Sequence, residues 1–269
     1  MKKTLLYTLL FPLFAAFTAC SEATDADNPF AYPDGMGGLR LENKTSTQIT
    51  IPVITKSANF DDVEVDDFYL GILNKADGSV VKEFDTFSSL VNSEDGLPLI
   101  LPHGEYTAIS SSFKKGETKV SDAPYFVDQQ DFVIEEKTTT NVELKCTFES
   151  LGVELVLSEQ FKKKLEEAPD NYGYKVTVSN GVADWEFTPE QKNPGYFLDP
   201  CNELIVKVTV RLGSSNQWYP ERTYRVKNDR NNPETSPKLG EYYIINLDAG
   251  EQEEKISLRT LALTDKIKK

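Results

Sequence analysis

The alternation of apolar and polar residues is the feature that most restricts the fold of this chain. It is clearest in the run LIVKVTVRL at 204–212, where every second residue is a leucine or a valine. A period of two belongs to β-strands, whose side chains point alternately to the two faces of a sheet. Comparable short runs predict further strands at 39–41, 48–55, 68–74, 80–84, 99–109, 132–134, 142–146, 152–157, 174–178, 183–187, 196–198, 218–226, 242–247 and 256–263.

Helical patterns are almost absent. One short helix is predicted in the second half, with Ser158 as its N-cap and with Phe161 and Leu165 on one face. Asp77-Gly78 lies between two predicted strands and indicates a tight hairpin, because glycine adopts positive φ without strain. Many short strands at this spacing are typical of β-sandwiches, so we predict an all-β protein.

The chain divides into two halves of similar pattern. Gly104-Glu105-Tyr106 begins one predicted strand and Gly240-Glu241-Tyr242 begins another, which suggests an internal repeat. About 250 residues suit either one large domain or two of ordinary size. We predict one β-sandwich domain at 39–148 and a second, with the helix, at 149–269.

The N-terminus has the pattern of a bacterial lipoprotein. Residues 1–19 join two lysines to an apolar segment that is too short to span a membrane, as in a signal peptide. The sequence Phe17-Thr18-Ala19-Cys20 looks like a lipobox, although its first position is usually leucine. We expect Cys20 to be acylated and to become the mature N-terminus. Residues 20–38 are acidic and turn-rich and are predicted to be a linker.

The charge of the chain excludes some partners. Removing residues 1–19 takes away two lysines and no acid, so the formal net charge falls from −14 to −16. A surface this acidic repels nucleic acids and anionic headgroups, so we expect no nucleic-acid partner. Attachment to a membrane is therefore expected through the lipid rather than through a basic patch.

Two further cysteines, Cys146 and Cys201, lie in a chain that is expected to be exported to a compartment where disulfides persist. Nothing in the sequence fixes the distance between them. A Cys146–Cys201 disulfide and two buried free thiols both remain open.

No catalytic or metal-binding pattern stands out, and no cofactor is expected. The sole histidine, His103, lies in a predicted Pro-His-Gly turn without partners at the spacing of a triad or a zinc site. The acidic run 61–67 lacks the spacing and the glycine of a calcium-binding loop, so a solvated lead-in to a strand is favoured. Two carboxylates would suffice for a glycosidase, but nothing distinguishes any pair.

Aromatic residues are frequent in the second half, and most of those at strand positions belong in a core. Trp218-Tyr219-Pro220 follows a polar turn and is the best candidate for an exposed pair. Exposed rings can stack on sugars, so Trp218 and Tyr219 are candidate ligand-stacking residues.

Several local motifs together resemble a known family. They are a lipobox with an acidic linker, Thr55-Lys56, Val65-Asp66-Asp67-Phe68, Asp77-Gly78, Leu101-Pro102-x-Gly104-x-Tyr106, Ala123-Pro124-Tyr125-Phe126, and a strand that ends at Cys146. The chain resembles an uncharacterised family, a domain of unknown function, of surface lipoproteins from gut anaerobes. Its layout is also similar to fimbrillin-type proteins, in which two transthyretin-like sandwiches follow a lipobox.

The resemblance implies a non-catalytic outer-membrane lipoprotein, exposed at the cell surface, that serves as a fimbrial or adhesive subunit. Its partners would be other surface subunits. In fimbrillin-type proteins a cut at an arginine frees a groove, and Arg40 in the first strand is placed for such a cut. Residues 256–263 are the candidate donor strand, or else the last strand of their own domain. The alternative function is a glycan-binding lipoprotein of a nutrient-uptake system.

Overall fold

A computed structural model describes residues 32–45, 60, 63–94, 96–213, 217–227 and 236–249, and the backbone of 256–260. The expected signal peptide, the expected acylation site Cys20, most of the predicted linker and the strand predicted at 48–55 lie outside these residues. Within the described part, no helix is long and apolar enough to cross a membrane.

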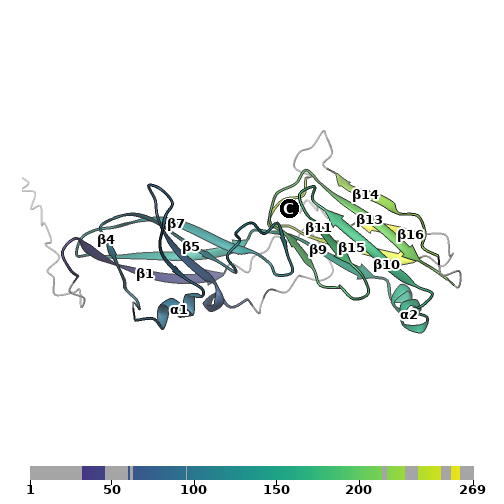
Figure 1. The fold of residues 1–269 in the computed structure, drawn as a ribbon, viewed down its shortest axis with the longest axis horizontal. Helices are drawn as coiled ribbons and strands as arrows, with labels where there is room; N and C mark the ends of the chain where they lie inside the picture. The colour runs from purple at the N-terminus through teal and green to yellow at the C-terminus, as the bar shows by residue number, and fades with distance from the viewer. Residues whose placement is uncertain are drawn as a thin grey trace, which may run out of the picture.

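The fold is all-β, as predicted, and consists of two sandwiches that lie end to end (Figure 1). The strands of the first sandwich form one sheet with the order β3-β2-β5-β7-β8-β1-β4. The sheet folds back on itself between β7 and β8, which are paired only at Phe126–Val127 and Thr147–Phe148. The bounds of the strands are β1 Met36–Thr45, β2 Tyr69–Asn74, β3 Val80–Phe84, β4 Leu99–Pro102, β5 Gly104–Ser111, β7 Phe126–Ile134 and β8 Thr139–Phe148.

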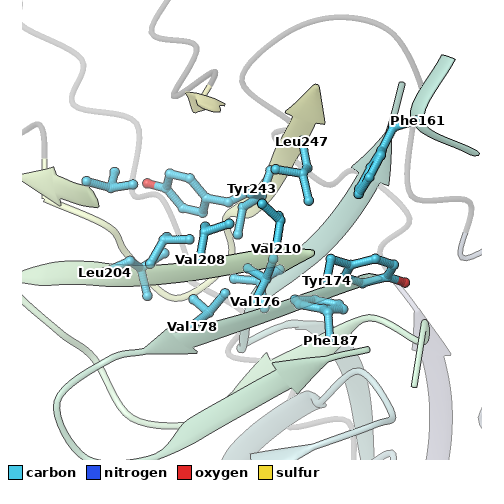
Figure 2. Close-up of a cluster of buried hydrophobic side chains, with 14 of the residues drawn as sticks. Phe161, Tyr174, Val176, Val178, Phe187, Leu204, Val208, Val210, Tyr243 and Leu247 are labelled. Carbon is cyan, nitrogen blue, oxygen red and sulfur yellow. The ribbon is translucent and has the colours of Figure 1, made fainter. Parts of the chain in front are cut away.

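The second sandwich is built from a four-stranded sheet, β11-β10-β13-β14, and a five-stranded sheet, β16-β15-β9-β12-β6. Its core contains the alternate valines of β13, together with Phe161, Tyr174 and Phe187 (Figure 2). The bounds of the strands are β6 Val120–Ser121, β9 Leu151–Leu157, β10 Gly173–Ser179, β11 Asp184–Phe187, β12 Gly195–Phe197, β13 Glu203–Arg211, β14 Arg222–Lys227, β15 Tyr242–Ala249 and β16 Ile256–Thr260.

The two sandwiches repeat one topology. In the first, β1 pairs in parallel with β8 and antiparallel with β4; in the second, β9 pairs in parallel with β15 and antiparallel with β12. The facing sheets match as well, because β3-β2-β5-β7 corresponds strand for strand to β11-β10-β13-β14. The Gly-Glu-Tyr repeat is not a trace of this symmetry. Gly104 begins β5 and Tyr242 begins β15, whereas the counterpart of β5 is β13.

An aromatic cluster joins the two sandwiches. Phe126 and Phe148, at the ends of β7 and β8, are buried with Tyr196 of β12 and Tyr242 of β15. Phe60 completes the cluster, with its ring centroid 5.4 Å from that of Phe126 and 5.2 Å from that of Phe148. The cluster therefore holds the ends of both sandwiches together through apolar contact.

A strand from the first sandwich also enters a sheet of the second. Between β5 and β7 the chain extends far enough for β6 to pair antiparallel with β12, Ser121 opposite Tyr196. Lys115 and Lys119 of the same connection form ion pairs with Asp199, which follows β12. The predicted boundary at 148/149 lies between β8 and β9, and because β6 crosses it, the folding of each half as a separate domain stays a prediction.

Local predictions are confirmed where the signal was strong. The Asp77-Gly78 hairpin joins β2 to β3, and Gly78 has a φ of 69°. The predicted helix is α2, Glu159–Glu167, and the side chain of Ser158 accepts a hydrogen bond from the N–H of Phe161 at its N-terminus. The short helix α1, Phe87–Val91, was not predicted, because five residues are too few to show a helical period.

Gly152→Ala tests the packing at the junction. A Cβ at position 152 would overlap the ring of Tyr242, so the ring would have to leave the cluster. We expect a loss of about 1–3 kcal/mol in the free energy of unfolding, as for overpacked cores. The measurement is urea unfolding of the chain from residue 21. Gly104→Ala is the matched control, since its Cβ would lie 3.4 Å from the Tyr106 hydroxyl, an ordinary contact. Equal losses in both variants would contradict this account.

Candidate functional site

The first candidate site is the groove that β1 fills. Residues Met36–Leu39 of β1 pair with β4, and Gly38–Thr45 pair with β8, so this strand lies between two others. Leu39 is fully buried and Leu41 nearly so, whereas Arg40 between them is exposed. The side chain of Arg40 is thus accessible directly after the last residue that pairs with β4.

The candidate donor strand lies at the other end of the chain. Ile256–Thr260 form β16, which pairs antiparallel with β15 between Ile245 and Ala249. The structure thus has it as the last strand of its own sheet, the second of the two arrangements left open by the sequence. β16 is the terminal strand of that sheet, and β15 is the strand with which it is paired.

The second candidate site is Trp218. The residue is 50% exposed, and its ring lies over the guanidinium of Arg211, with 5.4 Å between the guanidinium carbon and the ring centroid. The same ring covers Gly173, where an added Cβ would lie 3.2 Å from its Cη2. Arg211 is held in turn by the carbonyl oxygens of Pro169 and Tyr172. The indole is therefore fixed against the protein on one side.

Tyr219 does not form an exposed pair with Trp218. It is only partly exposed and packs against the core of the second sandwich. Its N–H donates to the carbonyl of Val210, and its own carbonyl accepts from the hydroxyl of Thr209. Neighbouring residues of an extended segment point to opposite faces, which separates the two rings.

Cys146 and Cys201 are free cysteines in the structure, so it does not contain the candidate disulfide. Cys146 is buried in the aromatic cluster at the junction, where its thiol lies 3.5 Å from the carbonyl oxygen of Ser110. Cys201 packs against the core of the second sandwich. Burial raises the pKa of Cys201 and raises that of Cys146 to about 11.

The other residues considered from the sequence form no site with one another. His103 is exposed in the turn between β4 and β5, and its N–H donates to the carbonyl of Gly35. The described part of the acidic run forms a single 3₁₀ turn, Val65–Asp67, before β2. Among the described residues, no group of three or more His, Cys, Asp or Glu could hold a metal ion.

One surface was missed in the sequence, namely the outer edge of β4. This strand is terminal in its sheet, and Ile100 and the preceding Leu97 are each 36% exposed. Leu99-Ile100-Leu101 is a continuous apolar run, so the sequence shows neither that Ile100 faces outward nor that its strand lies at an edge.

The fold and these features define a class: an all-β, two-sandwich protein whose distinctive surfaces are strand edges and one half-exposed tryptophan. The particular family follows from sequence. The chain belongs to the family described as a domain of unknown function (DUF4493), whose profile matches residues 35–264. A search of curated proteins found no match.

Solved structures that are similar to this chain include proteins from Bacteroides and Parabacteroides. A fimbrial assembly protein from Parabacteroides distasonis is 12% identical, covering 85% of this chain and 94% of that one, with a TM-score of 0.42. A candidate cell adhesion protein from Bacteroides fragilis is 9% identical, covering 86% and 99%, with a TM-score of 0.42. Candidate polysaccharide-binding proteins from Bacteroides thetaiotaomicron are 9% identical, covering 86% and 98%, also at 0.42. Likeness at this level transfers no function.

Thiol alkylation tests the state of the cysteines. At pH 8 a thiol of pKa 11 is ionised to roughly one part in a thousand, and the thiolate is the reactive form. In native protein from residue 21, we therefore expect iodoacetamide to label Cys201 before Cys146. After denaturation without reductant, intact mass should show both thiols labelled. Denatured protein that takes up label only after reduction would show that the disulfide forms.

Proposed function

We propose that this protein is a non-catalytic, lipid-anchored protein of the outer cell surface that serves as a structural or accessory subunit of a fimbrial or adhesive assembly. The observation that carries the proposal is the position of Arg40. A cut after Arg40 would release Met36–Arg40, which includes every residue of β1 that pairs with β4. The rest of β1, from Leu41 to Thr45, keeps its pairing with β8.

Such a cut would leave a groove that needs a new occupant. Loss of Leu39, which is fully buried, would empty an apolar site at a cost of about 2–5 kcal/mol, as for large-to-small changes in cores. The edge of β4 that pairs with Met36–Leu39 would also lose its partner for backbone hydrogen bonds. A strand from another molecule restores both, by the general mode in which a peptide adds to a sheet edge.

The segment Ile256–Thr260 is a suitable donor. Its sequence has Ile256 and Leu258 at the two-residue spacing that fills alternate pockets on one side of a strand. As a terminal strand paired with β15 alone, it can leave its sheet without disrupting other strand pairs. Acylation at Cys20 would hold each copy at the membrane until the cut after Arg40 separates the rest of the chain from its lipid anchor.

Two variants test this function in the native host. Arg40→Gln should prevent processing and abolish surface polymers, since the groove stays filled. Deleting residues 255–269 should leave a folded, processed protein that no longer polymerises. Polymers are detected as ladders in denaturing gels of unboiled surface fractions.

Arg222→Gln, at an exposed arginine of β14, is the matched control and should polymerise like the wild type. Unchanged ladders in Arg40→Gln, or in the deletion variant, would refute strand exchange at this groove.

The half-exposed Trp218 supports a second candidate function, glycan binding. An indole fixed on Arg211 and Gly173 offers its remaining surface to a sugar ring without further ordering of the side chain. The function would then be that of a surface binding protein in nutrient uptake.

Binding of the purified chain to a polysaccharide array tests this alternative. Trp218→Ala should weaken binding to any recognised polysaccharide at least tenfold, equivalent to about 1.4 kcal/mol. Tyr219→Phe, which keeps the packed ring, should bind like the wild type. Absence of binding by the wild-type chain would exclude the glycan function, and so would equal binding by Trp218→Ala.

A further inference from the structure

The repeated topology allows the two sandwiches to be compared residue by residue. In the second, one row across the sheet runs from Tyr242 through Gly152 and Tyr196 to Ser121 of β6. In the first, the corresponding row runs from Thr139 through Gly38 to Ile100. It ends there, because β4 is the terminal strand. Among the residues that the structure describes, the first sandwich therefore has no counterpart of β6.

The glycines of the two rows have similar environments, although the tyrosine rings that cover them come from different parts of the chain. The ring of Tyr242 lies directly on Gly152, and the hydroxyl end of the Tyr32 ring lies directly on Gly38. Both tyrosines are buried, and the Tyr32 hydroxyl is 2.6 Å from that of Thr139 in the same row. The outer end of the first sandwich is thus built like the end of the second sandwich that receives the junction.

The residue of the first sandwich that matches a covered residue of the second is more exposed, as expected if its edge has no partner strand. Tyr196, opposite β6 at the junction, is 6% exposed, whereas its counterpart Ile100 is 36% exposed. Leu97, beside the same edge, is also 36% exposed. Two apolar side chains thus remain accessible where the matching end of the second sandwich is covered by another sandwich.

The partner for this edge can be identified from the chain itself. Within the molecule, the covering strand β6 comes from the connection between β5 and β7 of the preceding sandwich. Its counterpart in the second sandwich is the connection between β13 and β14, which bears Trp218. Trp218 contacts the end of β13 that lies beside α2, far from the junction. The half-exposed indole is therefore at the free end of the second sandwich.

We propose that the Ile100 edge of one copy binds the Trp218 end of a second copy, so that copies associate head to tail. The contact reuses, between molecules, the arrangement that already joins the two sandwiches within one molecule. The two surfaces are different, so the contact is heterologous and generates open chains rather than closed dimers. It deepens the proposed assembly function but requires neither the cut at Arg40 nor the release of β16.

Pro102 limits how many residues of β4 can pair with an incoming strand. It corresponds to Leu198, whose N–H donates to the carbonyl of Lys119 beside β6. Proline has no N–H, so a strand added to β4 cannot make this bond. An incoming strand can therefore pair with Leu99–Leu101 only, and the indole must supply much of the buried area.

Sedimentation of the chain from residue 21, which carries no acylated cysteine, tests the contact. The wild type should associate reversibly as its concentration rises. Ile100→Asp and Trp218→Ala should each weaken association at least tenfold. Val182→Asp is the matched control, because Val182 is 57% exposed in the turn after β10, and it should associate like the wild type.

Disulfide trapping gives the direction of the contact. In a Cys201→Ser background, Ile100→Cys and Trp218→Cys chains should form covalent dimers when mixed and oxidised, but not when oxidised separately. A chain with both substitutions should form a covalent ladder.

These outcomes separate the contact from strand exchange. If association persists in the variant that lacks residues 255–269 and in Arg40→Gln, the contact is supported, whether or not these variants form surface polymers. A wild type that stays monomeric up to its solubility limit overturns the contact, and so does an Ile100→Asp variant that associates normally. Ile100→Cys dimers formed without the Trp218→Cys chain would overturn its head-to-tail direction.

Discussion

The ring cluster between the sandwiches is the contact on which the rest of the geometry depends. Phe126 and Phe148 end two strands of the first sandwich, and Tyr196 and Tyr242 lie on two strands of the second. Aromatic pairs at such centroid distances contribute about 0.5–1.5 kcal/mol each beyond their buried area. Because the cluster and β6 join the same two ends, the free ends of the molecule differ. One has the β4 edge and the other has Trp218.

Most of the strands and the main helix could be predicted because their signals are local. β13 alternates over its whole length, and α2 has a capping serine and a helical apolar pair. Among the elements that were missed, α1 and β6 are short or depend on distant partners. α1 has five residues, and β6 has two, which pair with β12, far along the chain. A two-residue strand has no period, so only the three-dimensional contact reveals it.

The internal repeat could be suspected from the sequence but not located there. Tyr106 donates a hydrogen bond to Pro102 four residues earlier, whereas Tyr242 donates to Glu154 of the neighbouring β9. The tyrosines of the two Gly-Glu-Tyr motifs thus make different hydrogen bonds, and they lie in strands that do not correspond. Cores accept many apolar residues of suitable volume, so a repeated topology needs no repeated sequence.

The rings of Trp218 and Tyr219 also show what the sequence alone cannot predict. The sequence predicts exposure equally for Trp218 and Tyr219, since both follow a polar turn. The pairing register determines which ring is exposed. Because Trp218 is bridged to Arg211, its ring points outward and that of Tyr219 points to the core. Pairing register is a property of two strands together and cannot be read from one of them.

The exposed edge of β4 could promote aggregation, but its short length and its proline limit this. Unpaired edge strands promote uncontrolled aggregation, and natural proteins limit them with proline, charge or short length. β4 is four residues long and ends in Pro102, so it can accept only a short strand. The net charge of −14 opposes close approach of copies, so a contact there has to depend on short-range apolar burial. Such a contact is weak between free molecules. On a surface where the proposed lipid anchor holds many uncut copies together, the effective concentration is high enough for weak contacts to act jointly.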